Sequence, residues 1–151
     1  MEKQILVSES YNNMYERGKH FVGVSMWHFE WCTKYRYKMM TKFEYNNLVK
    51  GCIRRAASEH KIKIIELEVM PEHIHLVAGL PGTMSPSKAM QLLKGRSSYL
   101  FFKMHPKARL RYPKGHFWSR GKFWASLRFI QVDQAREYVK NQLEHHRNST
   151  L

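Results

Sequence analysis

Residues 65–79 have the sequence IELEVMPEHIHLVAG, whose pattern indicates the centre of the fold. Apolar side chains alternate with polar ones up to Val69, Pro71-Glu72 interrupts the pattern, and an apolar run resumes from His73 to Gly79. Alternation with a period of two is typical of a strand, and a break at proline is typical of a turn. These residues therefore predict a β-hairpin whose second strand begins at His73.

Two histidines, His73 and His75, lie two residues apart on the second strand of this hairpin. Side chains at i and i+2 of a strand project from the same face, so the two imidazoles should lie side by side and could hold one divalent metal. Ile74, Leu76 and Ala78 would then face the helix-covered core. The pair by itself is weak evidence for a metal site, because nine histidines in 151 residues give about half an HxH motif by chance. A pair of histidines that binds no metal is the alternative interpretation.

Upstream of the hairpin, the sequence predicts a strand and then a helix. Residues 20–32 alternate between two faces, which predicts a long first strand. Thr41 and Glu44 have the spacing of a capping box, and apolar residues follow them at helical spacing. We therefore expect the first helix over residues 42–60.

Downstream of the hairpin, the sequence predicts two further helices with strand structure between them. Ser85-Pro86 has the pattern of an N-cap followed by proline at the first helical position, so a helix is expected over 86–104. The aromatic segment 117–129 predicts one or two strands. Asp133 is then expected to cap a last helix that runs to about His146.

The predicted order is strand, helix, strand, strand, helix, strand, helix. This is the order of the ferredoxin-like split βαβ fold with one helix appended. We therefore expect an α+β, ferredoxin-like (RRM-like) antiparallel sheet with helices on one face and an appended C-terminal helix that carries a tyrosine. A chain of 151 residues suits a single domain, which we place at 20–151, with 1–19 as a polar N-terminal extension.

The composition indicates a polyanionic partner. The chain holds 26 Lys plus Arg against 12 Asp plus Glu, a formal net charge of +14 with neutral histidines. Such a field attracts phosphates and releases their counterions, so binding should weaken steeply with salt. Around Arg120 and Lys122, aromatic and basic residues interleave, a pattern typical of proteins that stack single-stranded nucleic acid. The aromatic residues there are Phe117, Trp118, Phe123 and Trp124.

The sequence predicts neither a membrane segment nor a disulfide. No stretch approaches the roughly 18 uninterrupted apolar residues of a membrane span, and residues 1–19 lack the apolar run of a signal peptide. Cys32 and Cys52 are too far apart for a CxxC site, and we expect both to be reduced, small apolar residues. These features predict a soluble intracellular protein.

Tyr138 and Gln142 lie four residues apart in the predicted last helix, and therefore on one face. A phenol can act as a nucleophile and an amide oxygen can act as a third metal ligand, so this pair beside His73 and His75 would suit metal-assisted attack on phosphorus. Plainer interpretations stay open at this point. Tyr138 could simply pack in the apolar stripe of the helix, and Gln142 could be a surface amide.

Five sequence blocks in a fixed order carry a resemblance that runs from about residue 20 to residue 146. The blocks are Thr33-Lys34-Tyr35-Arg36, Pro71-Glu72-His73-Ile74-His75-Leu76-Val77, Leu93-Lys94-Gly95-Arg96-Ser97-Ser98, Phe117-Trp118-Ser119-Arg120-Gly121 and Glu137-Tyr138-Val139-Lys140-Asn141-Gln142. In these blocks the chain resembles the single-tyrosine transposases of the HUH endonuclease superfamily, the small enzymes of IS200-like insertion sequences. It departs from the family pattern mildly, because Glu72 stands where the family often has aspartate.

The resemblance implies an activity and the residues that perform it. His73 and His75 would be the histidine pair, Gln142 the third ligand of a Mg²⁺ or Mn²⁺ ion, and Tyr138 the nucleophile. The implied substrate is single-stranded DNA with hairpin ends, which is cut and rejoined through a 5′-phosphotyrosyl intermediate without a nucleotide cofactor. The resemblance also implies a homodimer in which the tyrosine helix of one subunit completes the histidine site of the other, in the cytoplasm and nucleoid of a prokaryote.

Basic and aromatic residues in the matched blocks and beside them are expected to contact DNA. They are Lys34, Arg36, Lys94, Arg96, Trp118, Arg120 and Lys122. For each of them a solvated basic rim is the plainer interpretation, and Arg96 or Trp118 could instead support packing. Two alternative functions also stay open: a related HUH nuclease that nicks repetitive palindromes, and a ferredoxin-like RNA-binding module without catalysis.

Overall fold

A four-stranded antiparallel sheet forms the centre of the molecule, of which the computed structural model describes residues 25–149. Its strand order is β2-β3-β1-β4, and all neighbouring strands are antiparallel. The strands are β1 (Ser25–Cys32), β2 (Lys63–Val69), β3 (His73–Leu80) and β4 (Phe123–Leu127). The predicted hairpin is confirmed as β2 and β3, which puts the histidine pair on an inner strand.

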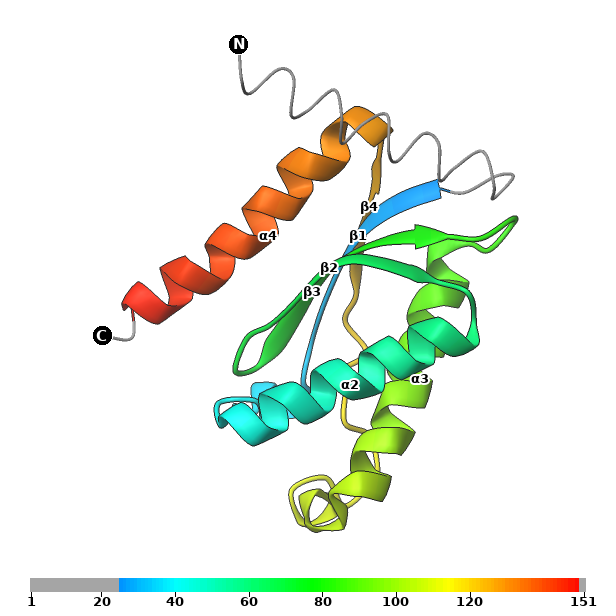
Figure 1. Ribbon diagram of the computed structural model, residues 1–151. Helices are drawn as coiled ribbons and strands as arrows, with labels where there is room; N and C mark the ends of the chain where they lie inside the picture. Colours follow the sequence, from blue (N-terminus) through cyan, green and yellow to red (C-terminus); the bar gives the residue numbers. More distant parts are fainter. Residues whose placement is uncertain (1–24, 150–151) are drawn as a thin grey trace.

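Helices cover both faces of this sheet (Figure 1). Two long helices, α2 (Phe43–Glu59) and α3 (Pro86–Met104), pack on one face, whereas α4 (Phe129–Ser149) crosses the other. The short 3-10 turns η1 (Lys34–Arg36) and η2 (Pro106–Leu110) complete the described elements. The α+β, ferredoxin-like architecture with an appended C-terminal helix is therefore confirmed.

The two faces of the sheet bury cores of different size. Side chains alternate between the two faces of each strand, and Phe29, Ile74 and Leu76 lie in a large core beneath α2 and α3. On the opposite face a small cluster forms between the sheet and α4, where Met26 and Val77 of the strands meet Val132 and Val139 of the helix. Because α4 covers this second face, nearly all of β3 is buried, including the polar residue His75.

The starts of two helices differ from the prediction. The capping box at Thr41 is wrong, because helix α2 has Lys42 at its N-cap without a side-chain hydrogen bond, and the Thr41 hydroxyl donates to the Lys38 carbonyl at 3.1 Å. Asp133 is not the cap of α4, since the helix begins at Phe129, and only one residue separates it from the end of β4. The predicted cap at Ser85 is confirmed, because its Oγ accepts from the Lys88 backbone N–H at 3.1 Å.

Other boundaries match within the described residues. Helix α2 lies within one residue of the expected range at each end, and α3 matches it. Segment 117–129 forms the strand β4 and an isolated bridge between Trp118 and Thr33. The first strand reaches Cys32 as expected, while its predicted start over 20–24 and the predicted extension 1–19 lie outside the described residues. None of the helices in the described part of the chain is long and apolar enough to cross a bilayer.

Candidate functional site

The histidine pair lies on the face of β3 that α4 covers. The rings of His73 and His75 are 5.1 Å apart between centroids and nearly perpendicular to each other. His75 is buried, with 3% of its surface exposed, while the His73 side chain keeps about a fifth of its surface exposed at the start of the strand. The strand therefore places the two imidazoles side by side, as its alternation predicts.

Glu72 holds the ring of His73 in place. Its Oε1 lies 2.8 Å from His73 Nδ1, and its Oε2 is buried without a hydrogen-bond partner among the described residues. When Nδ1 carries the proton and donates to this carboxylate, Nε2 keeps its lone pair, which is the tautomer that a metal-binding histidine needs. In this tautomer Glu72 orients the ring of His73, a role that the sequence did not predict for it.

Two further polar residues, His28 and Glu30, complete a cluster that the sequence did not predict. Both lie on β1, where Glu30 is the register partner of His75. His28 Nε2 is 3.3 Å from His75 Nδ1, and Glu30 Oε2 is 3.7 Å from the same atom. One potential ligand atom from each of these three residues lies within 4.8 Å of the others. The spacing of His28 and Glu30 at i and i+2 was a visible signal, but only the strand register brings them to His75.

Burial favours the neutral form of the central imidazoles. Burial lowers the pKa of His75 from 6.5 to about 4, because nearby His73 and His28 add to the effect and Glu30 only partly opposes it. Burial also lowers the pKa of His28, against the attraction of Glu30. Both rings are therefore uncharged near neutral pH, which is the state in which imidazole binds a metal.

A prediction about pH follows from the lowered pKa of His75. Between pH 4 and 6.5 the unfolded chain binds a proton at this residue and the folded chain does not, so the free energy of unfolding should rise with pH across this window and level off above it. Denaturant unfolding at a series of pH values measures the slope. The variant His75→Gln, which cannot titrate, should show a shallower slope over the same window, and an equal slope in both proteins would contradict this origin.

Helix α4 brings Tyr138 to the cluster. The Tyr138 ring lies 6.3 Å from that of His28 and 6.5 Å from that of His75, edge-on to both. About half of its surface is exposed. An ion pair between Arg136 Nε and Glu66 Oε2 at 2.9 Å helps to fix the helix on the sheet. Tyr138 is therefore presented to the histidines of its own chain, with open access from solvent.

The last of the predicted ligands, Gln142, follows Tyr138 by one turn on α4 and is half-buried. The donor set around the histidines suits a divalent cation of the Mg²⁺ or Mn²⁺ kind, because it joins imidazole nitrogens to oxygen donors. The buried Glu72 Oε2, which lacks a partner among the described residues, and the neutral state of His75 fit such an ion. A phenol beside such a set of donors is an arrangement able to attack phosphorus when a cation is bound.

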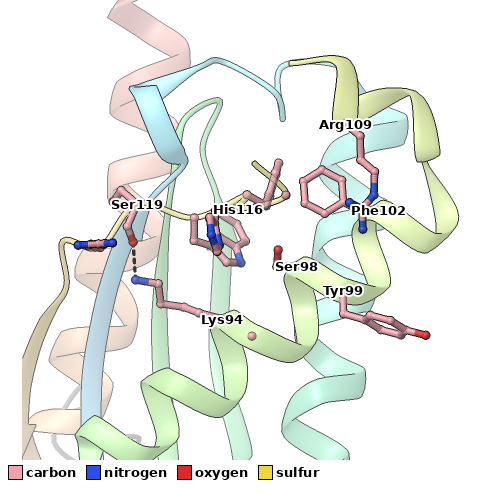
Figure 2. Close-up of a pocket in the computed structure, with 12 residues that line it drawn as sticks. Lys94, Ser98, Tyr99, Phe102, Arg109, His116 and Ser119 are labelled. Carbon is pink, nitrogen blue, oxygen red and sulfur yellow. Dashed lines mark hydrogen bonds between the residues drawn. The ribbon is translucent and has the colours of Figure 1, made fainter. Parts of the chain in front are cut away.

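A second group of predicted residues lies on the other face of the molecule, next to α3. Lys94, Trp118 and Arg120 help to line a cavity of about 420 Å³ between α3 and the segment before β4. Figure 2 shows Lys94 donating to the Ser119 carbonyl, at 2.6 Å, with Arg109 on another side of the hollow. Burial and the nearby Lys122 lower the pKa of Lys94. The cavity is thus lined by cations and by aromatic rings, as a site for nucleic acid would be.

Among the remaining residues that were predicted to contact DNA, some are exposed and one is paired with a carboxylate. Arg36 and Lys122 are exposed, and the Lys122 ammonium lies 5.3 Å from the Trp124 ring centre. Lys34 is half-buried above Tyr35. In contrast, Arg96 binds the Glu59 carboxylate through two hydrogen bonds, of 2.9 and 3.1 Å. For Arg96 the packing interpretation has direct support, and its contact with DNA stays a prediction.

Trp118 is buried, and so is the neighbouring Phe117. The Trp118 indole N–H donates to Ser97 Oγ at 2.9 Å, and its ring packs edge-on against Trp31 at 5.8 Å. Phe117 and Trp118 therefore belong to the core and do not form the stacking surface that the sequence predicted. An aromatic residue beside basic ones can be buried or exposed, and the sequence pattern does not distinguish the two. Phe123, half-exposed, keeps a free aromatic surface.

We expect Trp118→Ala to act mainly on stability. Truncating a buried tryptophan removes apolar contacts, leaves a cavity and frees the Ser97 hydroxyl, so the free energy of unfolding should fall by about 3–5 kcal/mol. Urea unfolding measures the loss. An unchanged midpoint together with weakened DNA binding would show instead that the ring serves as a DNA contact.

Comparison with known proteins identifies relatives that span most of the chain. A model of the family described as IS200-like transposases matches residues 22–142. The transposase of insertion sequence element IS200 from Salmonella typhimurium is 28% identical over 127 residues, which cover 80% of this chain and 83% of that protein. The ISDra2 transposase TnpA of Deinococcus radiodurans is 24% identical and covers 84% of this chain and 90% of its own length.

Solved structures share the fold. A candidate transposase from Deinococcus radiodurans superimposes with a TM-score of 0.64 at 25% identity, covering 81% of this chain and 93% of that one. A REP-associated tyrosine transposase, solved in complex with a REP hairpin, superimposes with a TM-score of 0.59 at 16% identity, covering 83% and 70% of the two chains. At that identity the second likeness concerns the fold alone.

Proposed function

Because this chain belongs to the family of IS200-like transposases, we propose that it cuts and rejoins single-stranded DNA at the hairpin-bearing ends of an insertion sequence. The family carries out strand cleavage and transfer on DNA. Beyond this family activity, we propose the form of the substrate, the nucleophile and the metal. The observation that carries it is the position of the Tyr138 ring, 6.5 Å from the neutral imidazole of His75.

In the proposed cleavage step, Tyr138 is the nucleophile. Its phenol gives up a proton to a base, Oη forms a bond to the scissile phosphorus, and the bond from phosphorus to the 3′ oxygen breaks. The leaving oxygen takes up a proton and becomes a 3′ hydroxyl, while the 5′ phosphate stays on Tyr138. The exposed half of the Tyr138 side chain gives a DNA strand access to Oη.

In the proposed rejoining step, a 3′ hydroxyl of another strand attacks the phosphotyrosine. The bond between phosphorus and Oη breaks, and Tyr138 recovers its proton. One phosphodiester is exchanged for another, so the cycle needs no hydrolysis of a nucleotide. The ring of Tyr138 must therefore stay beside the same phosphate between the two steps, and the packing of α4 on the sheet through Val132 and Val139 holds it there.

His73, His75 and Gln142 are the proposed ligands of a Mg²⁺ or Mn²⁺ ion. A divalent cation bound there would withdraw charge from the scissile phosphate and orient it for in-line attack. Glu72 keeps His73 in the binding tautomer, at 2.8 Å. Glu30, within 3.7 Å of His75, is a candidate for a further oxygen donor, which would give an otherwise neutral set of ligands a negative charge.

We also propose that the chain forms a homodimer in which the helix that carries Tyr138 can exchange between the two subunits. Mixing the inactive variants His73→Ala and Tyr138→Phe tests it. A dimer with exchanged helices would regain cleavage, because one of its sites would join an intact tyrosine to an intact histidine pair. A mixture that stays inactive would match the arrangement within one chain, where Tyr138 lies beside its own His75.

The direct test of the function uses a labelled single-stranded oligonucleotide with a hairpin from the end of the element that encodes the chain. With Mn²⁺ or Mg²⁺, the protein should become covalently attached to the 5′ phosphate of the fragment that lies 3′ of the cut, and a chelator should prevent the attachment. Attachment to any unrelated palindrome with the same efficiency would favour a nickase that processes repeats. Tight RNA binding without any cutting of DNA would favour a binding module.

A further inference from the structure

The turn after β1 has an unusual backbone. Tyr35 and Arg36 have φ angles of 64° and 53°, in the left-handed region, although neither is glycine. Residues with a Cβ adopt this region rarely, and two in succession are rarer still. Such a conformation persists when the surrounding structure enforces it, and it often marks a functional position.

Hydrogen bonds around Thr33 enforce this turn. The buried Thr33 donates its backbone N–H to the Glu72 carbonyl at 2.8 Å, and its hydroxyl donates to the Tyr37 carbonyl at 2.7 Å. The Arg36 N–H then closes the turn on the Thr33 carbonyl at 3.0 Å. These bonds fix the backbone on both sides of Tyr35.

The turn holds the Tyr35 ring outward, with two other tyrosine rings packed behind it. The ring lies nearly parallel to that of the buried Tyr112, at 11° and 6.2 Å between centroids, and 5.3 Å from that of Tyr37. More than half of Tyr35, 53%, is nevertheless exposed. An aromatic ring that is supported from within and open to solvent is the usual form of a stacking surface for a base.

Cations surround this ring. The Lys34 ammonium lies 5.5 Å from the Tyr35 ring centre, and the Arg111 guanidinium lies 4.4 Å from that of Tyr37. Arg36 is exposed beside them. A nucleotide stacked on Tyr35 would therefore find positive charge for its phosphates on several sides.

The turn also lies at the same end of the sheet as the candidate site. Cys32, the last residue of β1, is the register partner of His73. Thr33 binds the backbone of Glu72, whose carboxylate in turn orients His73. In Figure 1 the end of β1 and the turn between β2 and β3 lie together beside the start of α2. Tyr35 therefore lies at the end of the sheet that also carries His73 and Glu72.

We propose that Tyr35 is a stacking platform for an unpaired base of the DNA strand that enters the Tyr138 site. The inference rests on the proposed function, because it names a residue that positions the same substrate. It applies to an unpaired base in particular, since a paired one has both faces covered by its neighbours in the helix.

Three substitutions of Tyr35 separate stacking from structure. Tyr35→Phe keeps the ring and should bind a single-stranded oligonucleotide within about twofold of the unaltered protein. Tyr35→Ala should bind roughly 5- to 150-fold more weakly, the range for loss of one base stack. Tyr35→Gly should bind as weakly as Tyr35→Ala yet unfold at the same or a higher denaturant concentration than it, because glycine adopts the left-handed backbone without strain.

The measurement places 2-aminopurine at successive positions of the oligonucleotide and follows its fluorescence on binding. One position near the cut should be quenched by the unaltered protein and not by Tyr35→Ala. Phe43→Ala is the matched control, because Phe43 is an exposed aromatic residue at the start of α2, 80% exposed, and should leave both signals unchanged.

Three results would overturn the inference: equal binding by Tyr35→Ala and the unaltered protein, equal loss in Tyr35→Phe and Tyr35→Ala, or quenching that survives in Tyr35→Ala. Covalent attachment of DNA by the unaltered protein is measured in the same samples. If attachment occurs and Tyr35→Ala binds normally, the platform is wrong and the proposed function stands. If the unaltered protein neither binds nor cuts single-stranded DNA, the proposed function itself is wrong.

Discussion

Replacing Tyr138 by phenylalanine should abolish covalent attachment of DNA and slow strand cleavage by at least about 1000-fold. The phenolic Oη is the only atom removed, and it is the proposed nucleophile. The phenyl ring keeps the shape that lies edge-on to His28 and His75, so folding and DNA binding should change little. A denaturing gel of protein incubated with labelled hairpin DNA and Mn²⁺ measures the attachment.

Tyr45→Phe provides the control for this prediction. Tyr45 lies on α2, beyond the opposite face of the sheet, and stacks on His105 at 4.5 Å. Loss of its hydroxyl should leave cleavage unchanged. If Tyr138→Phe formed the adduct at the normal rate, another side chain would have to be the nucleophile, and the proposed role of α4 would be wrong.

Replacing His73 by alanine should abolish tight binding of Mn²⁺ and lower cleavage by more than about 100-fold, because loss of a direct ligand should exceed the 10- to 100-fold typical of an orienting residue. His73 is preferable to His75 for this test. Its side chain is partly exposed at the start of β3, so truncation should cost less stability there than at the buried His75. Calorimetric titration of Mn²⁺ into the protein without DNA measures the affinity directly.

Two companion variants sharpen the metal test. His60→Ala, at the C-cap of α2, should bind Mn²⁺ normally. Glu30→Gln keeps the shape of its side chain but removes the charge, so weaker Mn²⁺ binding would support Glu30 as a donor. Unchanged affinity in Glu30→Gln would remove only that residue from the site. Unchanged affinity in His73→Ala would contradict the metal centre at the histidine pair.

The strands and the long helices could be predicted because their signals are local. Alternation on both sides of Pro71-Glu72 determines the hairpin, and Ser85-Pro86 determines the start of α3. The start of α4 could not be predicted in the same way. Asp133 is a favourable capping residue, but a strand that ends at Leu127 leaves no room for a loop, and the helix begins a turn earlier.

The candidate site could be predicted only where one strand or one helix carries it. His73 and His75 share β3, and Tyr138 shares α4 with Gln142. The contribution of β1 depends on register, since Glu30 meets His75 across 45 residues of chain, and no local pattern specifies that pairing. Trp118 shows the reverse difficulty, because an aromatic residue between basic ones has the same appearance in sequence whether it is buried or exposed.

Mass spectrometry of the covalent complex identifies the nucleophile without any substitution. The unaltered protein is allowed to react with hairpin DNA and Mn²⁺, the DNA is digested to a short remnant, and the modified peptide is sequenced. We expect a 5′-phosphorylated nucleotide remnant on Tyr138 alone. A remnant on any other residue, such as the exposed Tyr35 near the same site, or cleaved DNA without a protein remnant, would contradict it.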